Sequence, residues 1–219
     1  MKHSKTHIYF VPGLAASPKI FEYLQLSEDK FELHYLEWLI PLSEKETIEN
    51  YAKRMANLVI EENAALVGVS FGGIMVQEMS KHVNTQKIII ISSVKTSNEF
   101  PKRLKLLQKT KAYKLFPTKT IANFEEFSVY AFGDFAEKRV KLYKEYLSVR
   151  NETYLTWAIY NVLNWQQDKP LKNSIHIHGS EDHVFPIKYI ENCISIENGT
   201  HIMILNKAKS ISKIITELF

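Results

Sequence analysis

Short apolar runs alternate with amphipathic stretches along most of the chain. The runs rich in β-branched residues predict buried strands, at residues 7–11, 31–38, 64–69, 87–92, 174–178 and 193–196. Apolar residues at helical spacing follow several of them, and one helix is expected to begin at the capping box Ser43-x-x-Glu46. A terminal amphipathic helix is expected over residues 202–218. Strands that alternate with helices predict a parallel sheet built from βαβ units.

The alternation of strands and helices stops after residue 93. From about residue 95 to residue 170 no convincing strand is found, and the apolar spacing is helical. This predicts a helical insertion within a single domain of residues 1–219. Aromatic residues are frequent between Tyr113 and Trp165, and most of them are expected to form the core of the insertion and its contact with the sheet. A few of them are expected to line a pocket.

The motif Gly68-Val69-Ser70-Phe71-Gly72 joins the strand at 64–69 to the helix that follows it. The small residues on either side of Ser70 give clearance for a tight turn that pushes its hydroxyl outward. The following helix directs its N-terminal N–H groups and positive dipole end toward the same place, where an oxyanion would form. We interpret this corner as a nucleophile elbow.

The glycines gather near the predicted strand ends. Of the seven in the chain, all except Gly133 lie in or beside four short segments, Pro12-Gly13-Leu14, Ser70-Phe71-Gly72, Gly179-Ser180-Glu181-Asp182 and Gly199-Thr200-His201. Each segment follows a predicted strand. Because the carboxyl ends of parallel strands meet at one edge of a sheet, we expect the four segments to converge there.

With Ser70, Asp182 and His201 at those strand ends, the chain order is serine, acid, histidine, as expected of α/β-hydrolases. The sequence resembles a compact member of that superfamily over essentially its whole length. The resemblance rests on Phe10-Val11-Pro12-Gly13-Leu14, Gly68-Val69-Ser70-Phe71-Gly72-Gly73, His178-Gly179-Ser180-Glu181-Asp182-His183-Val184-Phe185-Pro186 and Asn198-Gly199-Thr200-His201. It implies an α/β-hydrolase fold with about six parallel strands flanked by helices, and a helical lid insertion over about 95–170.

The resemblance also implies a role for each site residue. Ser70 would be the nucleophile, His201 the general base and then acid, and Asp182 the carboxylate that orients His201. The backbone N–H groups of Leu14 and Phe71 would form the oxyanion hole. The implied activity is that of a serine esterase or thioesterase, which cleaves a small carboxylic ester or thioester through an acyl-enzyme without a cofactor.

Two departures from the family pattern are visible. The oxyanion loop usually begins His-Gly, whereas this chain has Pro12-Gly13, so the internal hydrogen bond of the loop is expected to differ. The two leading strands of the family are also missing, because the first strand here already precedes the oxyanion loop. The missing strands imply a compact, wholly parallel member with about six strands.

Alternatives exist for the acid. Glu181 or Glu197 could supply the negative charge in place of Asp182, although the position of Asp182 between His178 and Pro186 fits the acid loop better. Some relatives carry the acid after the strand that here ends near Ser92. In this chain, that segment offers only Glu99.

The side chains of His176-x-His178 and Asp182-His183 are also of the types that bind metal ions. Histidine and carboxylate are common zinc ligands, and residues two apart in a strand share one face. A strand buried by helices makes chelation there improbable. We therefore expect no metal in the site.

Composition bears on partners and location. The chain has 219 residues and a net charge of +4, too mild to indicate nucleic-acid binding. The single Cys193 rules out an intramolecular disulfide and favours a cytoplasmic setting. The basic start and the apolar run at 8–11 are interrupted by Pro12-Gly13, which argues against a signal peptide, and no run approaches the ~18 apolar residues of a membrane span.

The start of the insertion is basic. Only Glu99 offsets the positive residues Lys95, Lys102, Arg103, Lys105, Lys109, Lys111, Lys114 and Lys119. Such a run is usually a solvated helix face. The alternative is a patch that steers an anionic small-molecule substrate toward the site.

Two rival functions share the same residues. A ligand-binding, receptor-like module could use the site for capture with slow turnover, and a lyase could use it as acid and base. Fold analogy does not separate these from a hydrolase, because function depends on the chemistry of the site.

Overall fold

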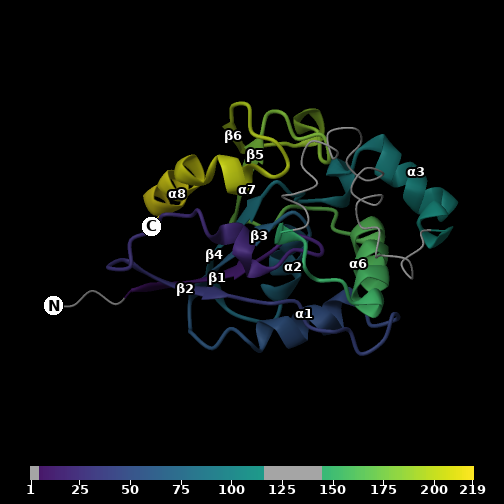
Figure 1. The fold of residues 1–219 in the computed structure, drawn as a ribbon, viewed down its shortest axis with the longest axis horizontal. Helices are drawn as coiled ribbons and strands as arrows, with labels where there is room; N and C mark the ends of the chain where they lie inside the picture. Colours follow the sequence, from purple (N-terminus) through teal and green to yellow (C-terminus); the bar gives the residue numbers. More distant parts are fainter. Residues whose placement is uncertain (1–4, 116–144) are drawn as a thin grey trace.

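The computed structural model describes residues 5–115 and 145–219. In this part of the chain, six parallel strands form one sheet in the order β2-β1-β3-β4-β5-β6 (Figure 1). The strands are β1 (Thr6–Val11), β2 (Phe31–Tyr35), β3 (Ala64–Val69), β4 (Thr85–Ile91), β5 (Ser174–Gly179) and β6 (Ile194–Ile196). The predicted class, a parallel sheet of about six strands flanked by helices, is confirmed.

Helices cover both faces of the sheet. They are α1 (Ile48–Ala56), α2 (Phe71–Met79), α3 (Lys102–Thr110), α6 (Glu152–Asn164), α7 (Met203–Asn206) and α8 (Ala208–Glu217), with 3₁₀ turns η1 (Pro18–Phe21), η2 (Ser97–Glu99), η3 (Ala112–Leu115) and η7 (Ile187–Tyr189). Alternate strand residues enter two separate cores: one contains residues of α1, α2 and α6, and the other residues of η1, α7 and α8. Figure 1 accordingly shows α8 and α1 on opposite sides of the strands.

The order of the strands reverses between β1 and β3. From β1 the chain first moves outward to β2 and then returns to place β3 on the other side of β1. The segments that follow the two strands therefore lead to opposite faces of the sheet, to η1 and to α2, from a common position at its carboxyl edge. Ser70 follows β3 and the Pro12-Gly13-Leu14 segment follows β1, so both lie at this position.

Three backbones cross closely at the corner between β3 and α2. A Cβ atom placed on Gly72 would lie 2.2 Å from the carbonyl oxygen of Val11 and 2.3 Å from that of Pro12. A Cβ atom on Gly68 would lie 2.1 Å from the carbonyl oxygen of Gly72. These separations exclude any side chain, so the two glycines are a steric requirement of the corner.

The capping box predicted at Ser43 was wrong. The Glu46 carboxylate does not bond the backbone N–H of Ser43, as a capping box requires. It accepts a hydrogen bond from Leu42 N (2.7 Å) and pairs with Arg54 (3.0 Å). The helix instead begins at Ile48, where the Thr47 hydroxyl accepts a hydrogen bond from Asn50 N.

Two further elements differ from the predictions by more than two residues or in their continuity. The second strand ends at Tyr35 rather than at residue 38. The predicted terminal helix at 202–218 is split at Lys207 into α7 and α8. Leu36 and Trp38 remain buried beyond the end of β2, so the apolar pattern continues past the strand.

The described parts of the insertion are helical, and they contain no strand. Tyr154 and Trp157 of α6 are buried against the sheet domain, and the Trp165 indole donates a hydrogen bond to Glu78 of α2 (2.8 Å). These aromatics form the expected contact with the sheet, whereas those of 116–144 lie outside the described residues. No helix in the described part of the chain combines the length and apolar character needed to cross a bilayer.

The corner generates a stability prediction. Gly72→Ala would gain up to about 1 kcal/mol from helix propensity alone, but the backbone contacts should outweigh this gain and destabilise the protein by about 3 kcal/mol. The midpoint of thermal unfolding should therefore fall by roughly 6–12 °C.

Gly13→Ala is the matched control, because a Cβ atom there would meet Ser70 Cβ at 3.6 Å, an ordinary van der Waals contact. It should leave the midpoint nearly unchanged. Equal midpoints for Gly72→Ala and the wild-type protein would show that the corner is not sterically closed.

Candidate active site

Ser70 occupies the turn from β3 into α2 with φ 53° and ψ −118°, a conformation in the left-handed half of the backbone map. Its backbone is fixed on both sides. Ser70 N donates to Ile91 O (2.9 Å), and Ser70 O accepts from the Ser93 hydroxyl (2.7 Å) and from Gly73 N (2.9 Å). The corner thus directs the Ser70 side chain away from the sheet edge at the start of α2.

The structure brings the three predicted side chains together. Nε2 of His201 lies 2.9 Å from Ser70 Oγ, and Nδ1 of His201 lies 2.9 Å from Asp182 Oδ2. An ionised carboxylate only accepts hydrogen bonds, so Nδ1 carries the proton toward Asp182. Nε2 then has its lone pair directed at the serine hydroxyl. In this tautomer the imidazole is a base for Ser70.

Asp182 is held by its own loop. Its Oδ1 atom accepts hydrogen bonds from Val184 N (2.8 Å) and Phe185 N (2.9 Å). Burial favours the neutral acid, but the charge and hydrogen bond of His201, with the neighbouring His178 and the Phe185 N–H, outweigh burial and hold the pKa of Asp182 below its ordinary value. Asp182 is therefore an ionised partner for His201 at neutral pH.

The other candidate carboxylates lie elsewhere. Glu181 and Glu197 are exposed. Glu99 is buried, accepts hydrogen bonds from the backbone of Lys95 and Glu191, and lies 3.8 Å from the Lys95 ammonium group. Of these four carboxylates, Asp182 is the one that contacts His201.

The loops that carry Asp182 and His201 are joined by their backbones. Ser180 N donates to Ile196 O (3.0 Å) and Glu181 N donates to Gly199 O (2.8 Å). A Cβ atom on Gly179 would lie 2.2 Å from Gly199 O, so this crossing is as tight as the one beneath Ser70. The close approach fixes the distance between the acid and the histidine.

The segment proposed for the oxyanion hole lies beside Ser70. Gly13 packs against the Ser70 side chain, and its carbonyl accepts a hydrogen bond from the Trp38 indole (3.0 Å). Within the described residues, the backbone N–H groups of Leu14 and Phe71 have no hydrogen-bond acceptor. Two donors near the serine are thus available to a ligand.

His176 and His178 make contacts inside β5. Nε2 of His176 lies 3.0 Å from Nδ1 of His178, and Nε2 of His178 lies 2.8 Å from Phe185 O. Both rings are buried, and burial is the main cause that lowers the pKa of His178 and lowers that of His176 to about 2. The pair supports the loop of Asp182 from beneath, where Nε2 of His178 lies 3.6 Å from Asp182 Oδ2.

The basic stretch divides into two groups. Lys95 is buried, and its ammonium group donates to the carbonyls of Glu191 and Asn192, so it does not belong to a surface patch. Helix α3 has no buried residue. Its Arg103 donates to the carbonyls of His183 and Val184, which ties the helix to the loop of Asp182.

Sequence reasoning missed the supporting role of three residues, Ser93, Trp38 and His178. Ser93 could have been found, because it follows the strand next to β3 and its hydroxyl reaches Ser70 O. No comparable pattern in the sequence indicated the supporting role of Trp38 or of His178. Their role depends on which carbonyl each ring meets after the chain has folded.

The buried histidines generate a pH prediction. In the unfolded chain His176 takes up a proton near its ordinary pKa of about 6.5, whereas in the folded protein it stays neutral, so stability falls as pH drops below about 6.5. At pH 5 this single group should cost about 2 kcal/mol of unfolding free energy relative to pH 7.5.

Denaturant titrations at both pH values would measure this loss. His176→Gln keeps a donor toward His178 and should remove about 2 kcal/mol of the difference, whereas the exposed His82→Ala should leave it unchanged. An equal loss in His176→Gln and the wild-type protein would rule out His176 as its source.

Among known proteins, only solved structures match the chain. No protein-family model and no curated protein sequence matches the chain. Solved structures do match. A bromoperoxidase from Bacillus anthracis aligns with a TM-score of 0.72 at 16% identity, over 97% of this chain and 91% of that one.

Two more structures give the same result. A lipase-esterase related protein from Clostridium acetobutylicum has a TM-score of 0.67 at 17% identity, over 100% of this chain and 96% of that one. The Bacillus megaterium epoxide hydrolase has a TM-score of 0.63 at 15% identity, over 99% and 94%. With the sheet order and the corner at Ser70, these likenesses show that the chain has the α/β-hydrolase fold.

Proposed function

We propose that the chain is a serine hydrolase that cleaves small carboxylic esters or thioesters through an acyl-enzyme. The observation that carries the proposal is the continuous path of hydrogen bonds from Ser70 through His201 to Asp182, at a corner with two available backbone N–H groups. Such an arrangement is a nucleophile, a base and an orienting acid in contact.

The first half of the proposed reaction acylates Ser70. His201 Nε2 removes the hydroxyl proton while Oγ attacks the carbonyl carbon, and the imidazolium that forms is stabilised by the ionised Asp182. The N–H groups of Leu14 and Phe71 would hold the negative oxygen of the tetrahedral intermediate. His201 then gives its proton to the departing alcohol or thiol.

The second half regenerates the enzyme. Water gives its proton to Nε2 of His201 and attacks the acyl carbonyl, and the collapse of the second tetrahedral intermediate returns the proton to Ser70 Oγ. The same two N–H groups serve both halves because the carbonyl oxygen keeps its place. No step requires a cofactor or a metal ion.

Aromatic side chains near the site favour small apolar acyl or alcohol groups. Phe71 directly follows Ser70 and stacks on Trp38 with ring centroids 5.1 Å apart, and Trp38 in turn contacts Tyr154 of α6 at 5.5 Å. The insertion would supply the lid and much of the substrate pocket. Solved structures named as esterases, from Thermogutta terrifontis among others, support an ester as the substrate. The lone Cys193 fits the cytoplasm as the proposed location.

A test with p-nitrophenyl esters separates hydrolysis from ligand capture. The wild-type protein should release p-nitrophenol in a burst followed by steady turnover, because acylation and deacylation are separate steps. A fluorophosphonate probe should label Ser70 and stop the reaction. Ser70→Ala should lose both labelling and roughly 10⁴-fold or more of the rate.

Ser93→Ala is the matched control, since Ser93 is a neighbouring serine whose hydroxyl donates to the Ser70 carbonyl rather than contacting His201. It should still be labelled. A burst without steady turnover would favour a receptor-like module, and labelling that persists in Ser70→Ala would refute the assignment of the nucleophile.

Asp182→Asn should cripple turnover without unfolding the protein. An asparagine keeps the shape of the side chain but loses the charge that stabilises the imidazolium and the tautomer of His201, an effect of about 10⁴-fold in the rate for the serine protease triad. Steady-state kinetics and circular dichroism would be measured on the same preparation.

Glu181→Gln is the control for this substitution, because Glu181 is the adjacent exposed carboxylate. Its rate should stay close to that of the wild-type protein. The reverse pattern, with Glu181→Gln inactive and Asp182→Asn active, would mean that the acid has been assigned to the wrong residue.

A further inference from the structure

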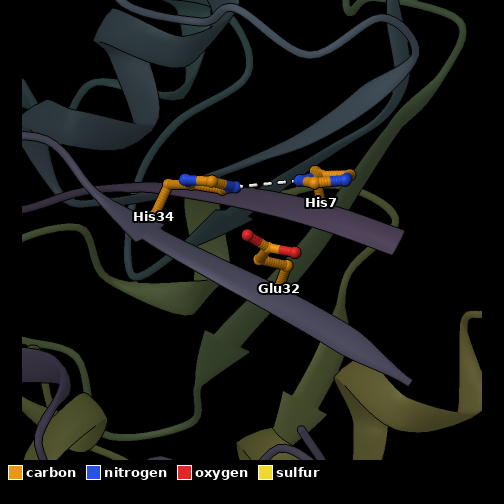
Figure 2. A group of neighbouring side chains, drawn as sticks. All are labelled: His7, Glu32 and His34. Carbon is orange, nitrogen blue, oxygen red and sulfur yellow. Dashed lines mark hydrogen bonds between the residues drawn. The ribbon is translucent and has the colours of Figure 1, made fainter. Parts of the chain in front are cut away.

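Three side chains with metal-binding atoms gather on the first two strands, away from Ser70. Glu32 and His34 lie two residues apart on the edge strand β2, and therefore on one face of the sheet. His7 of β1 is the register partner of Glu32, and Tyr9 is that of His34. Figure 2 shows the two rings nearly in line, with the carboxylate of Glu32 directed toward the space beside them.

The distances within this cluster are short. Nδ1 of His7 lies 3.0 Å from Nε2 of His34, and the three ligand atoms of His7, Glu32 and His34 all lie within 4.8 Å of one another. The two histidines are half-buried and Glu32 is exposed, so the group opens to solvent on one side. None of the three takes part in the chemistry proposed for Ser70.

We propose that His7, Glu32 and His34 bind a divalent transition-metal ion, with Zn²⁺ as the best match. Imidazole nitrogen and carboxylate oxygen are both common zinc ligands. Two imidazoles with a single carboxylate disfavour Mg²⁺ and Ca²⁺, which are bound mainly by oxygen atoms. Three protein ligands leave the fourth tetrahedral position to water from the open side.

The observed spacing is close to the one that zinc requires. Two Zn–N bonds of about 2.0–2.1 Å at a tetrahedral angle place the nitrogens roughly 3.3 Å apart. The His7 and His34 nitrogens are at 3.0 Å, so they need to move apart by a few tenths of an ångström, and each ring needs to tilt until its lone pair points at an ion beside the line between them. A rotation of the exposed Glu32 side chain brings its oxygen to the same ion.

The hydrogen bond between the two rings shows how the ion would enter. One ring donates its N–H and the other accepts, so a single proton lies between two nitrogens that both point at the same place. When zinc binds beside this contact, the donor ring gives up that proton and takes one from solvent on its other nitrogen, so both rings coordinate as neutral imidazoles with no net release of a proton. The exchange needs no rearrangement of the strands.

The rings are also held in place before the ion binds. The His34 ring stacks on Tyr9 with centroids 4.2 Å apart, and the His7 ring lies edge to edge with the His34 ring, nearly coplanar with it, at 5.3 Å. A ligand whose orientation is already fixed loses little entropy on binding. The bound ion would join the edge strand to β1, and so stabilise the folded state over the unfolded one.

The experiment uses untagged full-length protein stripped of metal with a chelator. Competition with a chromophoric zinc indicator should show one tight site per chain. With free Zn²⁺ about 100-fold above the dissociation constant, the unfolding midpoint should rise by roughly 5–10 °C. Mg²⁺ and Ca²⁺ at the same concentration should not raise it.

Two substitutions test the ligands. Glu32→Gln changes an exposed group, and His34→Phe keeps the stacking on Tyr9 while removing the ligand. Since even partners outside the ligand shell typically account for about 10–100-fold in affinity, each should weaken binding at least 100-fold. Co²⁺ in the wild-type protein should give the absorption of a tetrahedral site, which both variants should lose.

Controls separate this site from other histidines. His82→Ala alters an exposed histidine, His3→Ala a histidine outside the described residues, and His201→Ala the proposed base. All three should bind Zn²⁺ like the wild-type protein, and His201→Ala alone should lose esterase activity. The proposal is overturned if wild-type protein shows no stoichiometric site, or if Glu32→Gln and His34→Phe bind as tightly as the wild-type protein.

Discussion

The close backbone crossing at the end of β3 is the constraint on which the rest of the site depends. Gly72 allows α2 to start directly over the backbone of Val11 and Pro12, and Gly68 allows the strand to pass beneath Gly72. This contact places the loop after β1 and the turn after β3 against each other. The Ser70 side chain and the Gly13-Leu14 segment lie side by side for that reason. A second crossing, of Gly179 with Gly199, sets the acid and the histidine in the same way.

Much of this arrangement could be predicted from the sequence. The apolar runs identified β3 to the residue, and the glycine-bearing segments identified the sheet edge, since glycine is needed wherever backbones approach this closely. The order of Ser70, Asp182 and His201 then selected the family resemblance. Short motifs were enough to predict the site because each motif lies at the end of a strand, and parallel strands all end at the same edge of the sheet.

Other features were beyond the reach of a pattern. Ser43-x-x-Glu46 matches the sequence pattern of a capping box. In the folded protein, however, the Glu46 carboxylate pairs with Arg54 of α1, a contact that the sequence pattern does not reveal. The group of His7, Glu32 and His34 depends on the register of β1 against β2. His176 and His178, the histidines that stood out in sequence, are instead hydrogen-bonded to one another inside a buried strand. The aromatics of 116–144 lie outside the described residues.

The backbone of Ser70 has a further consequence for the stability of the fold. Its φ of 53° and ψ of −118° are readily adopted by glycine, whereas a residue with a Cβ atom held there raises the free energy of the folded state by about 1–3 kcal/mol. A chain optimised for stability alone would carry glycine at this position. The corner is therefore a place where the folded state is less stable than the same backbone would permit, and the extra free energy is stored at the residue whose hydroxyl contacts Nε2 of His201.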